Sequence, residues 1–191
     1  ARMIINFLAG PIAAGPSPVA RIVNVDALPA DLDAVLVEGA RASRFTGKTG
    51  QLHEGFVAQG GVVVRMALAG AGDPKAKDRS AALERAGAAV TAKYLTSGVT
   101  ALTLDLSGAG LSATDAAAVL LGARLRGWRH DVYRTKLADD QKPSLTTIHV
   151  ANAPAGTVEA WAVEAALAEG VEFTRELVAE PANVIYPASF V

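Results

Sequence analysis

Residues 42–49, Ala-Ser-Arg-Phe-Thr-Gly-Lys-Thr, carry the residue types of a phosphate-binding loop, with alanine in place of the first glycine. In such a loop backbone N–H groups surround the phosphates, a lysine (here Lys48) reaches the outer phosphates, and a hydroxyl (here Thr49) binds Mg²⁺. The chemistry also needs a helix that starts at the lysine, because a helix N-terminus attracts anions. Gly50 follows at once and disfavours a helix. We therefore predict a glycine-rich turn at residues 46–50, and the alternative is a nucleotide hydrolase that uses Lys48.

Two further glycine pairs follow predicted strands, at positions where α/β folds bind ligands. They are Gly70-Ala-Gly72 and Gly108-Ala-Gly110, and neither completes the Gly-x-Gly-x-x-Gly pattern of a dinucleotide-binding loop. We interpret both as chain reversals. The alternative is a stand-alone module that binds a nucleotide or ADP-ribose near residues 108–110 or 47–50.

The histidines and paired acids have no spacing typical of a metal or catalytic site. His53, His130 and His149 lie far apart, and His149 alternates with apolar residues in a predicted strand. The pair His130-Asp131 fits either an oriented base or a simple packing pair, and the acids at 139–140 indicate a solvated charge cluster. No Gly-x-Ser-x-Gly elbow is present. We predict no catalytic, cofactor-binding or metal-binding residue in this chain.

The composition suits one globular domain without thiol chemistry. The chain has 191 residues, of which 51% are apolar, and much of that share is alanine, which indicates close helix packing. It has no cysteine, which excludes disulfides and cysteine-based zinc sites. A net charge of −1 gives no global field for nucleic acid or anionic membranes. No apolar run approaches the ~18 residues of a membrane span, so we predict a soluble cytoplasmic protein without nucleic-acid or membrane partners.

The first third of the chain predicts mainly strands. Short apolar or β-branched runs there are bounded by turn residues, as is typical of strands. A loop rich in proline and glycine follows the first of these runs, and one helical turn follows the third. The predicted strands cover residues 4–8, 20–25, 33–38 and 61–68, the loop covers 10–18, and the helical turn covers 39–45.

The rest of the chain predicts helices alternating with strands. Asp73-Pro74 predicts a helix start, with apolar residues at helical spacing as far as Tyr94 and a stop at Gly98. Ser112 with Asp115 resembles the capping box of a second helix. Strands are predicted at 99–106 and 145–151. A long helix follows at 157–179, with Val163, Leu167, Val171, Thr174 and Val178 along one face.

This order of elements predicts the fold class. Strands that alternate with helices need crossover connections, which place helices against the faces of a parallel or mixed sheet. We predict one three-layer α/β domain at residues 1–179, with a mixed β-sheet flanked by helices. The turn Glu180-Pro-Ala-Asn183 and a second proline at 187 then predict a junction at residues 180–191 that leads to a missing domain.

Three segments resemble the N-terminal domain of the M17 leucyl (cytosol) aminopeptidases. They are residues 45–51, residues 122–136 together with Lys142-Pro143, and residues 169–187, which contain Glu-Pro-Ala-Asn. Their order and spacing fit that domain along most of the chain. Two positions depart from the family pattern: Ala179, where asparagine is usual, and His130, where phenylalanine is usual.

The resemblance implies a fold, an activity and partners. It implies a macro-domain-like fold and a parent enzyme that releases N-terminal residues from peptides with two divalent metals, zinc or manganese. The family's metal-binding Asn-Thr-Asp-Ala-Glu-Gly-Arg segment is not in this chain, so we predict that the chain alone is inactive. The predicted function is a non-catalytic assembly and regulatory domain that contacts its own catalytic domain and neighbouring subunits of a hexamer.

Overall fold

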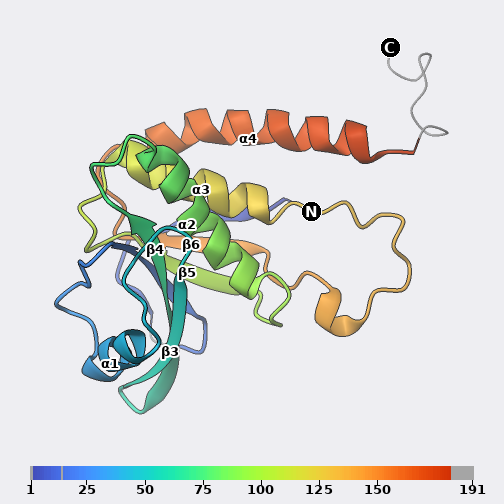
Figure 1. Cartoon of the computed structure of the whole chain (residues 1–191). Helices are drawn as coiled ribbons and strands as arrows, with labels where there is room; N and C mark the ends of the chain where they lie inside the picture. Colours follow the sequence, from blue (N-terminus) through green and yellow to red (C-terminus); the bar gives the residue numbers. More distant parts are fainter. Residues whose placement is uncertain (1, 14, 182–191) are drawn as a thin grey trace.

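The computed structural model describes residues 2–13 and 15–181. Over these residues the chain alternates strands and helices as a single α/β domain (Figure 1). The strands are β1 Ile4–Phe7, β2 Val19–Asn24, β3 Leu52–Gln59, β4 Val62–Gly72, β5 Ala101–Asp105 and β6 Thr147–Ala151. The helices are α1 Ala34–Ala42, α2 Arg79–Tyr94, α3 Ala113–Arg126, the short 3-10 helix η1 Asp139–Gln141, and α4 Thr157–Ala179.

The strands form one mixed sheet in the order β1-β6-β5-β2-β4-β3. The first five strands in this order, from β1 through β6, β5 and β2 to β4, are parallel to one another. The strand β3, at the other edge, pairs antiparallel with β4 as a hairpin. Parallel neighbours need crossovers: α1 and β3 lie between β2 and β4 in the chain, α2 leads from β4 to β5, and α3 leads from β5 to β6. The predicted class, a mixed sheet flanked by helices, is confirmed, whereas the likeness to macro domains stays a prediction.

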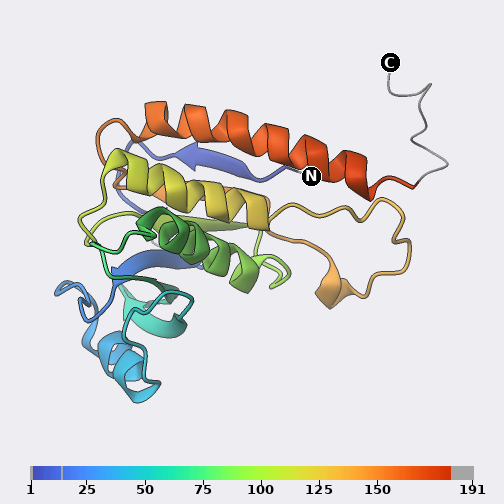
Figure 2. The ribbon, with the colours of Figure 1, turned by 45° about the horizontal axis from the view of Figure 1, so that its top comes forward.

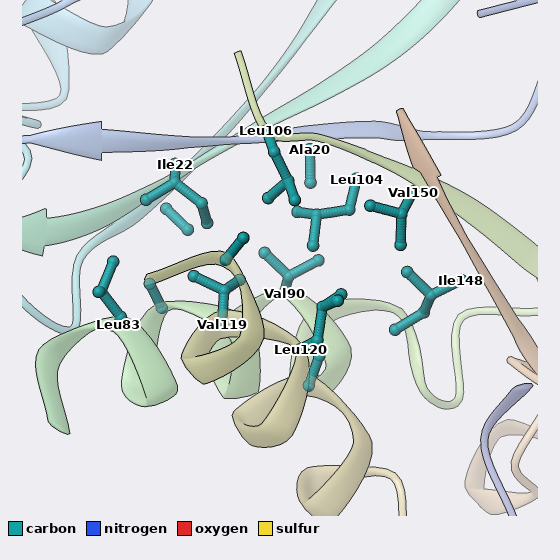
Figure 3. Close-up of a cluster of buried hydrophobic side chains, with 14 of the residues drawn as sticks. Ala20, Ile22, Leu83, Val90, Leu104, Leu106, Val119, Leu120, Ile148 and Val150 are labelled. Atoms are coloured by element: carbon teal, nitrogen blue, oxygen red, sulfur yellow. The ribbon is translucent and has the colours of Figure 1, made fainter. Parts of the chain in front are cut away.

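The main core lies between the sheet and the helices α2 and α3. Ala20, Leu104 and Val150 share one row across β2, β5 and β6, and their side chains point at Val90 of α2 and Leu120 of α3 (Figure 3). All five are buried. Each of the larger side chains gains roughly 1.5–3 kcal/mol from leaving water, so this row holds the helices to the sheet.

Glycine permits an unusually close approach of α2 and α3. A methyl group at Gly87 would lie 1.9 Å from the carbonyl oxygen of Val119, and one at Gly122 would lie 1.9 Å from that of Glu84. Neither site can accept a Cβ unless a helix moves. This close contact agrees with the close helix packing that the high alanine content indicates.

The helix α1 covers the other face of the sheet, where a strand was expected at residues 33–38. Asp33 caps α1 instead, and its carboxylate accepts the N–H of Val35 at 2.8 Å. Leu36 and Ala40, four residues apart, pack in a second core against β3 and β4, while Val35 is exposed. The strand prediction was wrong because the cap and the four-residue spacing outweigh the β-branched residues.

The start of α2 also differs from the prediction. Asp73-Pro74 does not begin the helix, because the Asp73 carboxylate accepts the N–H of Lys75 at 2.8 Å and forms a separate turn. The helix begins at Arg79. The capping box of Ser112 and Asp115 on α3 is confirmed, with both reciprocal bonds at 3.1 Å.

The long helix α4 runs along the outside of α3 (Figure 2). Its bounds match the predicted 157–179, and it ends just before Pro181. The side chains that it buries are those of Thr157, Trp161, Ala168 and Glu172. The apolar face expected from the sequence lies elsewhere on the helix and faces solvent. Most of the predicted 180–191 junction, including Asn183 and Pro187, lies outside the described residues.

Candidate functional site

The glycine-rich loop at residues 45–51 is closed by its own glutamine. The Gln51 side-chain oxygen accepts the backbone N–H groups of Thr46 at 3.0 Å, Gly47 at 3.1 Å and Lys48 at 3.0 Å. In a phosphate-binding loop N–H groups of this kind hold the anion. A strand, β3, follows this loop, so no helix N-terminus begins at Lys48. The prediction of a structural turn is confirmed.

The same loop lies directly on the end of β4. The N–H of Gly70 donates to the Gln51 carbonyl at 2.8 Å, and the N–H of Gly72 donates to the Gly47 carbonyl at 2.9 Å. A methyl group at Gly70 would lie 2.1 Å from the Lys48 carbonyl oxygen. The pair Gly70 and Gly72 is therefore not the predicted chain reversal but the end of β4, where only glycine allows the loop to approach.

The second glycine pair, Gly108 and Gly110, follows β5. Arg21, whose side chain is 5% exposed, donates to Asp31 at 2.9 Å and to the Ser107 carbonyl at 3.3 Å. This hydrogen bond from Arg21 lowers the pKa of Asp31. A methyl group at Gly108 would lie 2.2 Å from the Arg21 Nη2 atom. Arg21 thus occupies the space against Gly108.

The loop beyond Gly108 is tied down by the chain itself. The side-chain amide of Asn24 donates to the carbonyl of Ala109 at 3.0 Å. Gly108 and Gly110 have φ angles of 89° and 64°, which confirms a chain reversal at this pair. The Ser112 hydroxyl accepts the N–H of Asp115, and the Asp115 carboxylate accepts the N–H of Ser112. The Ser107 and Ala109 carbonyls of this segment thus make hydrogen bonds within the chain.

The three histidines lie at three separate places. His53 Nδ1 is 2.9 Å from the Ser43 hydroxyl beside α1, and burial lowers the pKa of His53. His149 Nδ1 is 2.9 Å from the Asn6 amide on the sheet. His130 lies in the loop after α3. Among residues 2–13 and 15–181, no three His, Asp or Glu side chains are grouped to hold a metal ion.

The paired acids have structural roles. Asp139 forms a 2.6 Å ion pair with Lys142 in the exposed turn η1, as expected of a solvated cluster. Asp131 pairs with Arg129 at 2.8 Å and not with His130. The oriented-base alternative for His130-Asp131 therefore has no hydrogen bond to support it.

Two of the three segments that carry the family resemblance meet at the end of α4. Arg175 donates to the Leu125 carbonyl at 3.1 Å, and its guanidinium lies 5.8 Å from the ring centre of Trp128. Tyr133 donates to Glu180 at 2.6 Å, which raises the pKa of Tyr133. The end of α3 and the loop after it thus hold the C-terminal end of α4.

A buried ion pair joins α3 to α4 and was not predicted. Arg124 donates twice to Glu172, from Nε at 3.1 Å and from Nη2 at 3.0 Å, and the two side chains are 10% and 2% exposed. Its one signal in the sequence is the spacing, since Glu172 follows Trp161 and Ala168 on the same face of the helix. Such a pair fixes the register of two helices but does not indicate catalysis.

Comparison with known proteins identifies the family of this chain. The profile described as "Cytosol aminopeptidase family, N-terminal domain" matches residues 16–137. This chain belongs to the cytosol aminopeptidase family. Two relatives, each named a probable cytosol aminopeptidase, come from Rhodopseudomonas palustris (strain BisA53), 34% identical over 98% of this chain, and from Caulobacter vibrioides, 36% identical over 91%. The resemblance seen in the sequence is thereby confirmed.

The chain corresponds to the N-terminal domain of that family. It spans only 36% and 34% of the lengths of these two relatives. A tomato leucine aminopeptidase mutant shares the fold, with a TM-score of 0.75 at 21% identity, and the match covers 98% of this chain and 40% of that one. The bottromycin maturation enzyme BotP in complex with Mn gives a TM-score of 0.70 at 26% identity, over 92% of this chain and 34% of that one. In the described part of this chain, no helix is both long and apolar enough to cross a membrane.

Proposed function

We propose that this chain is the non-catalytic N-terminal part of a metallo-aminopeptidase, with a role in the assembly and regulation of that enzyme. The observation that carries the proposal is the match to an N-terminal domain together with the length of the relatives, which are about three times as long. The catalytic residues then belong to the remaining two-thirds of the protein. The parent activity is the release of N-terminal residues from peptides in the cytoplasm.

The site geometry supports a structural role for this part. The Gln51 side-chain oxygen accepts three backbone N–H groups of the loop at 45–51, and Arg21 fills the space against Gly108. The metals, zinc or manganese, would then be held by carboxylates and a lysine outside this chain, where they polarise the peptide carbonyl and activate a water. A manganese complex of BotP agrees with this choice of metals.

The domain boundary proposed for the full protein lies at residue 179, with residues 180–191 as the start of the junction. Helix α4 ends at Ala179, and Pro181 prevents its continuation. The bonds of Tyr133 and Arg175 hold the end of α4 against α3 and the loop after it. A domain anchored in this way can position neighbouring catalytic domains in a homo-oligomer, for which we propose a hexamer.

Deletion of residues 1–179 from the full-length protein tests the proposal. We expect the intact protein to hydrolyse leucine p-nitroanilide with Zn²⁺ or Mn²⁺ and to sediment as a hexamer. The deleted protein should form a smaller assembly, while keeping its metal content. An unchanged assembly after deletion contradicts the assembly role, and full-length protein without peptidase activity contradicts the parent function.

A further inference from the structure

The outer side of α4 carries an uncovered apolar stripe. Val163, Leu167 and Val178 are 71%, 54% and 81% exposed. Val171 and Thr174 continue the same face, and together these five residues are the α4 stripe. Large aliphatic side chains aligned on one exposed helix face mark a surface that a partner covers.

The α4 stripe borders a groove that continues across α3 to α2. Arg175 lines both the hollow beside Leu167 and the groove between the three helices. Two small residues of α2, Ala81 and Ala88, line the groove. Because small side chains let a backbone come close, this surface has the shape to accept a helix or an extended segment.

The groove is positively charged, although the chain as a whole carries a net charge of −1. Arg85, Arg126 and Arg175 line it, against one acid, Glu84. Three positive charges and one negative charge give a local balance of +2. A partner that fits must therefore combine apolar side chains with acidic ones.

We propose that the α4 stripe and this groove bind a segment of apolar and acidic residues from the C-terminal remainder of the same full-length chain. The inference rests on the proposed function. The part of the relatives that this chain does not cover is about twice as long as the part that it covers. The stripe extends almost to the C-terminal end of α4 at Ala179. Because the segment and the groove belong to one chain, their binding is intramolecular, so modest contacts suffice.

Charge argues against a second copy of this domain as the occupant. In a two-fold contact the same patch meets itself. Arg85, Arg126 and Arg175 would then face their own copies, and like charges brought together oppose association. The remainder of the chain carries no such constraint.

Hydrogen exchange in the full-length protein and in the 191-residue chain tests the proposal. We expect peptides within residues 163–178 to exchange at least about tenfold more slowly in the full-length protein. Leu167→Asp should remove that gain. Phe173→Asp is the matched control, because Phe173 is 59% exposed and lies about 120° around the helix from Leu167. It should leave the gain intact, and neither variant should change the unfolding midpoint of the 191-residue chain.

The outcomes separate this inference from the proposed function. Equal exchange in both lengths, in a full-length protein that hydrolyses leucine p-nitroanilide, overturns the docking surface and leaves the function standing. Loss of protection in Phe173→Asp as well as Leu167→Asp also overturns it, because the effect would then not belong to the stripe. Protection of the 191-residue chain that rises with its own concentration would instead identify a second copy as the occupant.

Discussion

The loop at residues 45–51 and the outer side of α4 are opposite cases of apparent binding sites. The loop has the residue types of a phosphate site, but Gln51 accepts three of its N–H groups. The α4 stripe has no chemical motif, yet it leaves Leu167 and Val178 largely exposed. A motif whose polar groups are satisfied within the chain supports the fold. Apolar surface without a cover indicates where another part of the protein binds.

The difference follows from what each group costs when it lacks a partner. A part-buried N–H without an acceptor costs about 1–3 kcal/mol, so a loop of this kind is either closed by its own chain or occupied by a ligand. Exposed aliphatic side chains cost little in a folded domain, but their burial by a partner is favourable by roughly 25 cal/mol per Å². The three N–H groups of the loop therefore have their acceptor within the chain, whereas the exposed aliphatic side chains of α4 would gain from burial by a partner.

The largest expected effect concerns the inner side of α4. Glu172→Ala leaves the buried Arg124 without its partner and should destabilise the domain by about 3–5 kcal/mol. Urea unfolding measures this loss. The double variant Glu172→Leu with Arg124→Leu should recover most of it, since no unpaired charge then remains. A loss below about 1 kcal/mol for Glu172→Ala would mean that α4 is not anchored through this pair.

The loop should respond to its acceptor and not to its lysine. Gln51→Ala removes the acceptor of three N–H groups and should cost about 1–3 kcal/mol of unfolding free energy. Lys48→Ala is the matched control in the same loop, and because Lys48 is exposed its effect should stay within about 0.5 kcal/mol. If Lys48→Ala instead abolished binding of ATP in calorimetry, the phosphate-site alternative would be correct.

The smallest expected effect is a pH dependence of the unfolding free energy that comes from His53. His53 packs beside Phe45, with ring centres 6.2 Å apart, and burial lowers the pKa of His53 below its usual 6.5. The unfolded chain therefore binds a proton more readily than the folded one. The contribution of His53 to stability is complete above pH 6.5 and declines as the pH falls toward the folded pKa.

Urea unfolding at pH 7.5 and at pH 5.5 measures that decline. In the His53→Gln variant the difference between the two pH values should shrink, because glutamine does not titrate. The Tyr133–Glu180 contact at the end of α4 should be unaffected by this substitution. An unchanged pH difference in His53→Gln would show that another group is responsible.

The sequence predicts well what local chemistry decides. The capping box of Ser112 and Asp115, and the end of α4 before Pro181, follow from hydrogen bonds and backbone limits between near neighbours. The family resemblance at residues 45–51 and 122–136 also came from the sequence. The parallel neighbours of the sheet follow from the alternation of strands and helices.

Tertiary packing decides the rest. Residues 33–38, at the start of α1, were expected to be a strand, because their β-branched residues give no sign that Leu36 would pack on β3 and β4. The strand β3 itself was missed, since Gly55 interrupts its apolar pattern. Glu172 could not be recognised as buried until its partner on α3 was placed. The face of α4 that carries the most aliphatic residues proved to be the exposed one.

Assay of the 191-residue chain beside the full-length protein is the most direct test of the central claim. Both are incubated at equal concentration with leucine p-nitroanilide and either Zn²⁺ or Mn²⁺. We expect metal-dependent turnover from the full-length protein and none from the 191-residue chain. Metal-dependent turnover by the 191-residue chain alone would contradict the account, because it would place the catalytic site among these residues.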